Sequence, residues 1–245
     1  MTATAILLSE WIKIRSVRSV VGSLTAVFLA TMAVTVLSFA TVGQAEVDNA
    51  DADLVFAAFY ALNFGQIAAI SFGATAISSE YVNGALRLSL AAVPRRTLFY
   101  TVKMSLIGGM ALVVGMVTSF SSFLVGQLFM GDYAIGLGEQ GALRAAVGSG
   151  IYLALMALFA AGLTVVSRSA VAVLSLLIPF ILIVSFVVGD VVGGVADYLP
   201  DRAGQLVLHQ HPDSSIGPWA GLAVTAAWAG AALLAGWWAL RRRDA

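Results

Sequence analysis

Six long apolar runs, almost free of charge, constrain what this 245-residue chain can fold into. A helix needs about 20 mostly apolar residues to cross a bilayer, and every run reaches that length. Only 11% of the residues are charged, whereas soluble domains carry about 25%. We therefore expect a single all-α integral membrane domain over residues 1–245. Its six transmembrane helices are predicted at 20–42, 54–78, 104–130, 145–167, 170–192 and 217–240.

The basic residues indicate the orientation of these spans. Six crossings put both termini on one side, and that side holds 11 of the 13 Lys and Arg residues, all but Arg144 and Arg202. Basic loops stay in the cytoplasm, so we expect cytoplasmic termini and an extracellular loop at 193–216. A secretory signal is the alternative for the first run. Its 23 residues exceed the roughly 7–15 of a signal core.

Residues 1–19 have a different pattern. Leu7, Trp11 and Ile14 recur at helical spacing beside a polar stripe that includes Lys13. This pattern predicts a helix lying in the inner membrane interface, with Arg15 reaching back to water. The alternative is a solvated basic segment that serves orientation alone.

Small residues indicate how the spans pack. Lipid provides no hydrophobic drive for helix association, so close contact depends on Gly, Ala and Ser. Alanine recurs at 223, 227, 231 and 235, and glycines cluster in the third and fourth spans. Pro179 interrupts the fifth span and predicts a kink there.

The sequence lacks the motifs of several enzyme classes. It has no P-loop, no H-E-x-x-H, no G-x-S-x-G and no cysteine, and no charge lies at the centre of a predicted span. A net charge of zero gives no argument for nucleic acid. We expect no enzymatic activity and no cofactor bound by this chain.

Two pairs of polar residues are weaker candidates. Asn63 and Gln66, inside the second span, are expected to form interhelical hydrogen bonds, and the alternative is that they line a substrate path. His209 and His211 alternate in the 193–216 loop, where they offer two of the ligands that zinc needs. The same loop contains "DYLPDRAGQLVL", which predicts a short helix resting on the outer membrane surface.

The loop "ISSEYVNGALRLSLAAVPRR", 77–96, concentrates charge between the second and third spans. Ser79 is suited to begin a short helix, and Pro94 disfavours helix at the residue before it. An apolar face would contain Leu86, Leu90 and Val93. Glu80 and Arg87 would share another side, with Gly84 between them allowing close backbone approach.

This loop resembles that of ABC type-2 transporter permeases, the membrane subunits of bacterial exporters. That family has the pattern E-x-x-x-G-x-x-x-x-x-L-x-x-x-P-x-x leading into a lysine before the third span. Glu80, Gly84, Leu90, Pro94 and Lys103 fit it, and "LLSEWIKIRSVRS" and "GWWALRRRDA" are similar to the family's terminal segments.

The resemblance implies a permease in the bacterial plasma membrane that exports a hydrophobic or amphipathic compound. A separate cytoplasmic subunit would use ATP and Mg²⁺, and two copies of it would join two permease copies, identical or related. The loop would be the coupling helix that docks on this ATPase. Its docking residues would be Glu80, Tyr81, Gly84, Arg87, Pro94, Arg95 and Arg96.

Other interpretations remain open. The loop charges fit ordinary topology signals, although that rule does not explain Glu80 or Gly84. The chain would also fit a membrane anchor or sensor that binds a partner without transport. A membrane-embedded enzyme is a third interpretation, which the lack of an acid–base or metal cluster disfavours.

Overall fold

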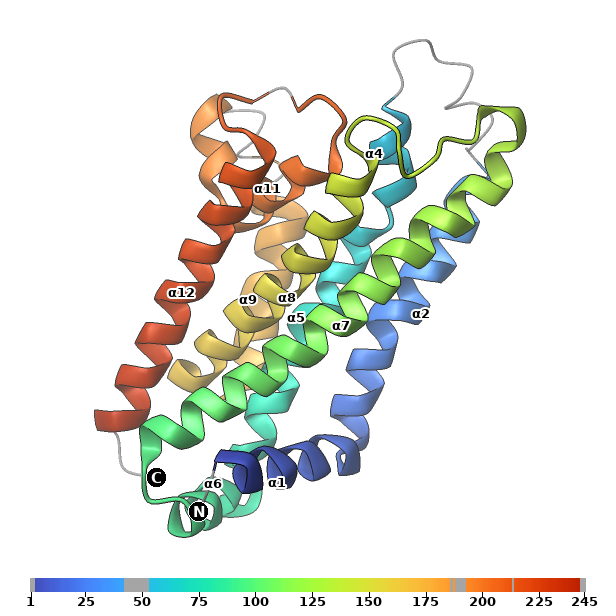
Figure 1. Ribbon diagram of the computed structural model, residues 1–245. Coiled ribbons are helices and arrows are strands. Elements are labelled where there is room, and N and C mark those ends of the chain that lie inside the picture. The colour runs from blue at the N-terminus through green and yellow to red at the C-terminus, as the bar shows by residue number, and fades with distance from the viewer. Residues whose placement is uncertain (1–2, 42–52, 186, 188–192, 213, 243–245) are drawn as a thin grey trace.

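The computed structural model describes residues 3–41, 53–185, 187, 193–212 and 214–242, whose regular structure is entirely helical. Among them, five helices are long and apolar enough to cross a membrane, which fits a multi-pass membrane protein and five of the six predicted spans. Figure 1 shows these helices as an elongated bundle. The elements are α1 (Ala3–Ser16), α2 (Arg18–Thr41), α4 (Leu54–Phe59), α5 (Leu62–Ser78), the 3₁₀-helix η1 (Ser79–Gly84), α6 (Ala85–Ala92), α7 (Arg96–Met130), α8 (Ala142–Ser167), α9 (Ala170–Pro179), the π-helix η3 (Phe180–Val184), α11 (Pro200–Gln205) and α12 (Pro218–Arg242), with short 3₁₀ turns at Gly131–Tyr133, Gly193–Tyr198 and Leu206–Leu208.

The spans differ from the prediction in three places. The third helix begins at Arg96 rather than 104, because helical structure resumes directly after Pro94 and runs through Lys103. The second is interrupted between α4 and α5. The predicted span 170–192 begins as α9 and changes to π-helix after Pro179, while residues 186 and 188–192 lie outside the described residues. The sixth crossing therefore stays a prediction.

Helix α8 occupies the centre of the bundle and packs against α5, α7 and α12. A Cβ atom on Gly73 of α5 would lie 2.0 Å from the Ala157 carbonyl oxygen of α8. On the other side of α8, a Cβ on Gly162 would lie 2.6 Å from the Ala232 carbonyl carbon of α12. The predicted close packing through glycine is therefore confirmed at Gly162 of the fourth span, whereas the contact at Gly73 was not predicted.

Helix α12 uses a different face from the alanine stripe. Ala223, Ala227, Ala231 and Ala235 are exposed. The buried face instead contains Gly221, Leu222, Thr225, Ala229, Ala232 and Gly236. The alanine stripe therefore does not pack against the rest of this chain.

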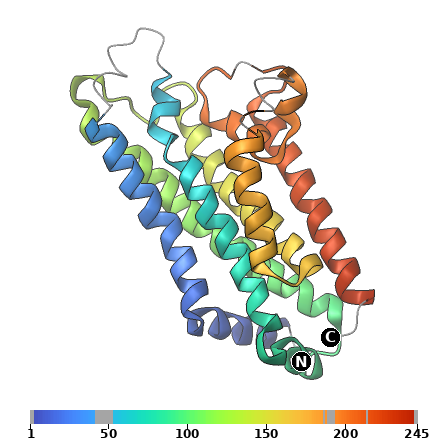
Figure 2. The same cartoon turned by 180° about the vertical axis from the view of Figure 1, so that it is seen from behind.

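Helices α1 and α6 and the last turn of α12 lie at one end of the bundle, which we call the terminal end (Figure 1). Helix α1 runs across the bundle axis there, and Figure 2 shows the same arrangement from behind. The expected stripe is wrong in detail: Ile14 is buried with Ile6 and Glu10, while Leu7 and Trp11 point outward, 40% and 38% exposed.

Helices α4 and α11 lie at the opposite end, which we call the far end (Figure 1). The predicted short helix forms as α11 and packs against α12, while its place on the outer membrane surface stays a prediction. Thr225 Oγ1 donates to the Pro200 carbonyl at 2.8 Å. A Cβ on Gly204 would lie 2.3 Å from the Tyr152 ring of α8.

Candidate functional site

The loop between α5 and α7 consists of two short helices that meet at Gly84. The backbone of Gly84 has φ +72°, a left-handed conformation that side chains disfavour. No described atom lies within 4 Å of a Cβ built there, so the glycine is required for the turn and not for close approach. The expected single helix is therefore divided into η1 and α6. Helix α6 ends at Ala92, before Val93 and Pro94, as predicted.

The apolar face predicted for this loop is confirmed. Leu86 and Val93 are buried at 6% and 8% exposure, and Leu90 packs partly against the same core. The opposite side carries large apolar side chains at the surface: Val82 is 57% exposed and Leu88 is 73% exposed.

Four charged side chains meet beneath the loop at the terminal end. Lys103 Nζ of α7 lies 2.7 Å from Glu10 Oε2 of α1 and 2.6 Å from Glu80 Oε1 of η1. Lys13 Nζ lies 2.6 Å from Glu10 Oε1 and 3.4 Å from Glu80 Oε1. Ser89 of α6 accepts from Lys13 at 2.8 Å and donates to Glu80 Oε2 at 3.0 Å. We call these five residues the ionic cluster.

The ionic cluster fixes four elements, α1, η1, α6 and α7, to one another. Glu10, Glu80 and Lys103 are 2%, 5% and 2% exposed, so each charge depends on its partners and not on water. Two carboxylates balance two ammonium groups, and this arrangement avoids an uncompensated buried charge. The cluster therefore holds α1 and the loop in a defined position on α7.

The remaining predicted docking residues have different environments. Tyr81 donates to the Val165 carbonyl at 3.4 Å, and the Arg168 guanidinium lies 5.8 Å from its ring centroid, which ties the loop to the end of α8. Arg87, Pro94 and Arg95 are exposed.

Arg96 contacts a different part of the bundle. Its NH1 donates to the Leu240 carbonyl of α12 at 2.9 Å and lies 3.4 Å from the Arg241 carbonyl. The structure thus brings Glu80 together with α1 and α7, and Arg96 together with α12. The docking role of the predicted residues stays a prediction.

Sequence reasoning missed Lys13 and Ser89 as partners of Glu80, and Glu10 as the second carboxylate beside Lys103. The available signal was Glu10 itself, an acid in an otherwise basic and apolar N-terminal segment, three residues before Lys13. Such i, i+3 pairs meet on one helix face.

Gln66 and Asn63 both make hydrogen bonds in the part of α5 near the far end. Gln66 is 2% exposed, and its Oε1 accepts from the Tyr152 hydroxyl of α8. Asn63 Nδ2 donates to the Tyr60 carbonyl at 3.0 Å. For Gln66 the interhelical hydrogen bond is therefore present, and a substrate path past either residue stays untested.

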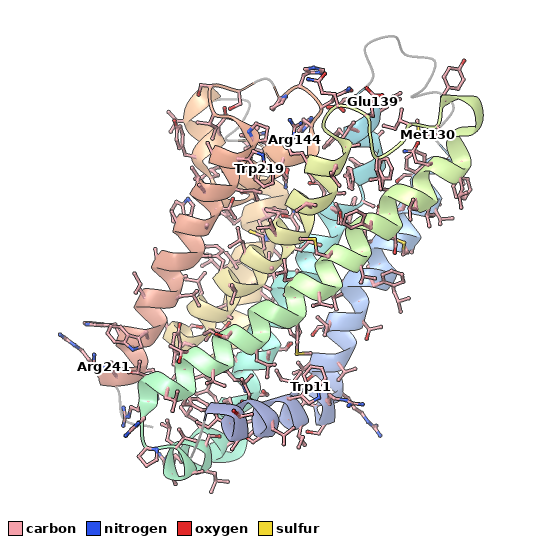
Figure 3. All side chains as sticks on the ribbon, viewed as in Figure 1. Trp11, Met130, Glu139, Arg144, Trp219 and Arg241 are labelled. Atoms are coloured by element: carbon pink, nitrogen blue, oxygen red, sulfur yellow. The ribbon has the colours of Figure 1, made fainter. Side chains whose placement is uncertain are left out.

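His209 belongs to a contact between α4 and the loop before α12. Asp53 Oδ2 lies 3.4 Å from His209 Nδ1 and accepts from the Gln210 N–H at 2.9 Å. The Arg144 guanidinium, labelled in Figure 3, donates to the carbonyls of His209 and Gln210 at 2.5 and 3.0 Å. The Phe56 ring stacks on His209 with centroids 4.1 Å apart. We call this contact the far-end clamp.

Electrostatics favour an ionised Asp53 in the clamp. Burial raises the pKa of Asp53, but hydrogen bonds from His209, Phe56 and Gln210 together lower it further, so the net pKa falls below its ordinary 3.8. No group of three His, Cys, Asp or Glu residues suited to a metal occurs in the part of the chain that the structure describes. The described residues therefore provide no third zinc ligand beside His209 and His211.

The architecture defines a class: a multi-helix bundle of the membrane-protein type, with an ionic cluster under a two-helix loop. No protein-family model, curated protein or solved structure matches the chain. The assignment of function therefore depends on the residues themselves.

Proposed function

We propose that this chain is the permease subunit of an ATP-driven ABC transporter in the bacterial plasma membrane, with six crossings and cytoplasmic termini. A separate ATPase subunit docks on the loop of η1 and α6. Two such ATPases and a second permease copy complete the working unit. Export of a hydrophobic or amphipathic compound follows from the resemblance of the loop motif.

The ionic cluster beneath the loop is the observation that carries this proposal. A loop that served topology alone would need basic charge but no fixed geometry. Here Glu80 is buried against Lys103 at 2.6 Å, and that pair secures the inner side of the loop. The outer side presents Leu88 and Val82 beside the exposed Arg87. A firmly held element with apolar and basic groups on its outer side suits transmission of force from a docked protein.

The exposed alanine stripe of α12 supports a second permease copy. Small residues allow close helix contact in a membrane, and in this chain Ala223, Ala227, Ala231 and Ala235 face outward. A partner helix could therefore pack on the stripe without displacing the buried face of α12.

Purification of the tagged chain from its own cells in mild detergent tests the proposal. The sample should carry a P-loop ATPase and hydrolyse ATP in a vanadate-sensitive manner. Leu88→Glu should abolish both properties while the chain still inserts, because Leu88 is exposed and makes little contact with the fold. Glu139→Arg changes a charge in an exposed turn at the far end and should leave both intact.

Two results would contradict the proposal. A well-folded chain that never carries an ATPase would exclude docking. Capture of a signalling protein without ATP hydrolysis would support the membrane anchor or sensor instead.

A further inference from the structure

A basic groove lies between the start of α7 and the end of α12. Three arginines, Arg95, Arg96 and Arg241, are among its described lining residues, and none of those described residues is a carboxylate. We propose that it binds the phosphate headgroup of an anionic phospholipid. Its lining residues are Arg95, Arg96, Thr97, Leu98, Thr101 and Arg241.

Two hydrogen bonds across the helices give the groove a fixed shape. Arg96 NH1 donates to the Leu240 carbonyl at 2.9 Å, which ties the first turn of α7 to the last turn of α12. Trp237 Nε1 donates to Thr97 Oγ1 at 3.3 Å and joins the same two helices one turn deeper. The groove is therefore part of the folded bundle rather than a chance gap between side chains.

The charged groups around the groove suit a phosphate. The Arg241 guanidinium lies 4.8 Å from the Trp237 ring centroid, a cation–π arrangement that orients it. Arg95 and Arg241 are both exposed at the rim. Guanidinium groups bind phosphate through paired N–H donors, so the exposed Arg95 and Arg241 favour an anionic headgroup.

The position of the groove favours a lipid over a soluble anion. It lies where two membrane-competent helices end, and Figure 3 shows Arg241 at the tip of α12. Trp237 contacts two of its lining residues, Thr97 and Arg241, and tryptophan concentrates at the headgroup level of a bilayer. Basic pockets between transmembrane helices on the cytoplasmic side bind anionic headgroups. This inference rests on the proposed membrane orientation and not on the proposed ATPase.

Native mass spectrometry of the isolated chain in neutral detergent tests the inference. Dioleoylphosphatidylglycerol should bind more tightly than dioleoylphosphatidylcholine. The single variant Arg95→Gln should weaken phosphatidylglycerol binding about fivefold, and Arg95→Gln with Arg241→Gln should weaken it roughly 30-fold. The matched control, Arg15→Gln with Arg18→Gln, removes the same charge at the same end but outside the groove. It should change binding far less.

Three results would overturn the inference. If the groove variants and the control lost the same affinity for phosphatidylglycerol, binding would depend only on the total positive charge of the chain. Equal binding of both lipids by the unmodified chain would show that the groove has no preference for an anionic headgroup. Displacement of the lipid by millimolar inorganic phosphate would identify a soluble anion site. The isolated chain is measured without an ATPase, so a negative lipid-binding result would leave the proposed ATPase docking intact. If the double variant does not fold, the single variant Arg95→Gln still tests the groove.

Discussion

Lys103 is surrounded by carboxylates and not by water. Its ammonium group contacts Glu10 and Glu80 at 2.7 and 2.6 Å, and its side chain is 3% exposed. A buried ion pair contributes little net stability compared with apolar residues, but removal of one partner leaves a buried charge unbalanced. The cost of a substitution therefore depends on which charges remain.

Lys103→Met should destabilise the protein strongly. The substitution leaves Glu10 and Glu80 with Lys13 alone, and loss of one partner of a buried pair costs about 3–5 kcal/mol. The free energy of unfolding in a detergent titration measures this loss. Glu10→Gln combined with Lys103→Met should cost less than the sum of the two single changes, by about 0.5–3 kcal/mol. Strict additivity would show that the four charges do not act together.

Gly84→Ala should cost about 1–2 kcal/mol, because alanine disfavours the left-handed backbone at this position. No described atom would clash with the new Cβ, so the loss comes from conformation alone. The same unfolding titration measures it. Gly109→Ala in α7 also meets no described atom within 4 Å, has ordinary helical φ, and should be neutral or stabilising. A neutral Gly84→Ala would mean that the loop bends elsewhere.

At the scale of helices and loops, the features that could be predicted from the sequence are those that depend on the local pattern of residues. Five membrane-competent helices, a helix over 3–16, the end of α6 before Pro94 and the inward face of Leu86 could all be predicted from periodicity and proline geometry. The interfacial position of α1 stays a prediction. The ionic cluster around Glu80 could not be predicted, because Glu10 and Lys103 are distant in the chain and meet only after α1 folds across the bundle. The buried face of α12 was also unreadable, since alanine and glycine suit lipid and helix contacts alike.

The far-end clamp should weaken in acid. Because the pKa of Asp53 is depressed in the folded protein, its contribution is fully present above the ordinary pKa of 3.8 and is lost as pH falls through the lower folded value. Hydrogen exchange of the Gln210 amide, which donates to Asp53, measures the opening.

A comparison of variants isolates this effect from the intrinsic pH dependence of exchange. Asp53→Asn should expose the Gln210 amide even at neutral pH and remove the acid transition. Asp197→Asn, which alters a separate hydrogen bond to Ser214, should behave as the unmodified chain does. An acid transition that survives Asp53→Asn would assign the titration to another group.

At the scale of the whole molecule, the absence of cysteine makes orientation directly measurable. Single cysteines at Leu88, exposed at the terminal end, and at Glu139, exposed at the far end, mark the two sides. In intact bacteria an impermeant thiol reagent should label Glu139→Cys and not Leu88→Cys, because basic segments stay inside. After cell lysis both should react. Labelling of Leu88→Cys from outside would reverse the orientation.

The central place of α8 has a consequence for the order in which the protein is made. Chains emerge from the ribosome N-terminus first, so α8 can meet α5 and α7 as soon as it is synthesised. Its other flank must wait for Ala232, because Gly162 packs on the backbone of α12. Fifty residues, 168–217, separate the end of α8 from the start of α12 at Pro218. During that interval the Gly162 flank of α8 lacks its partner helix, so the bundle is complete only after α12 has been synthesised.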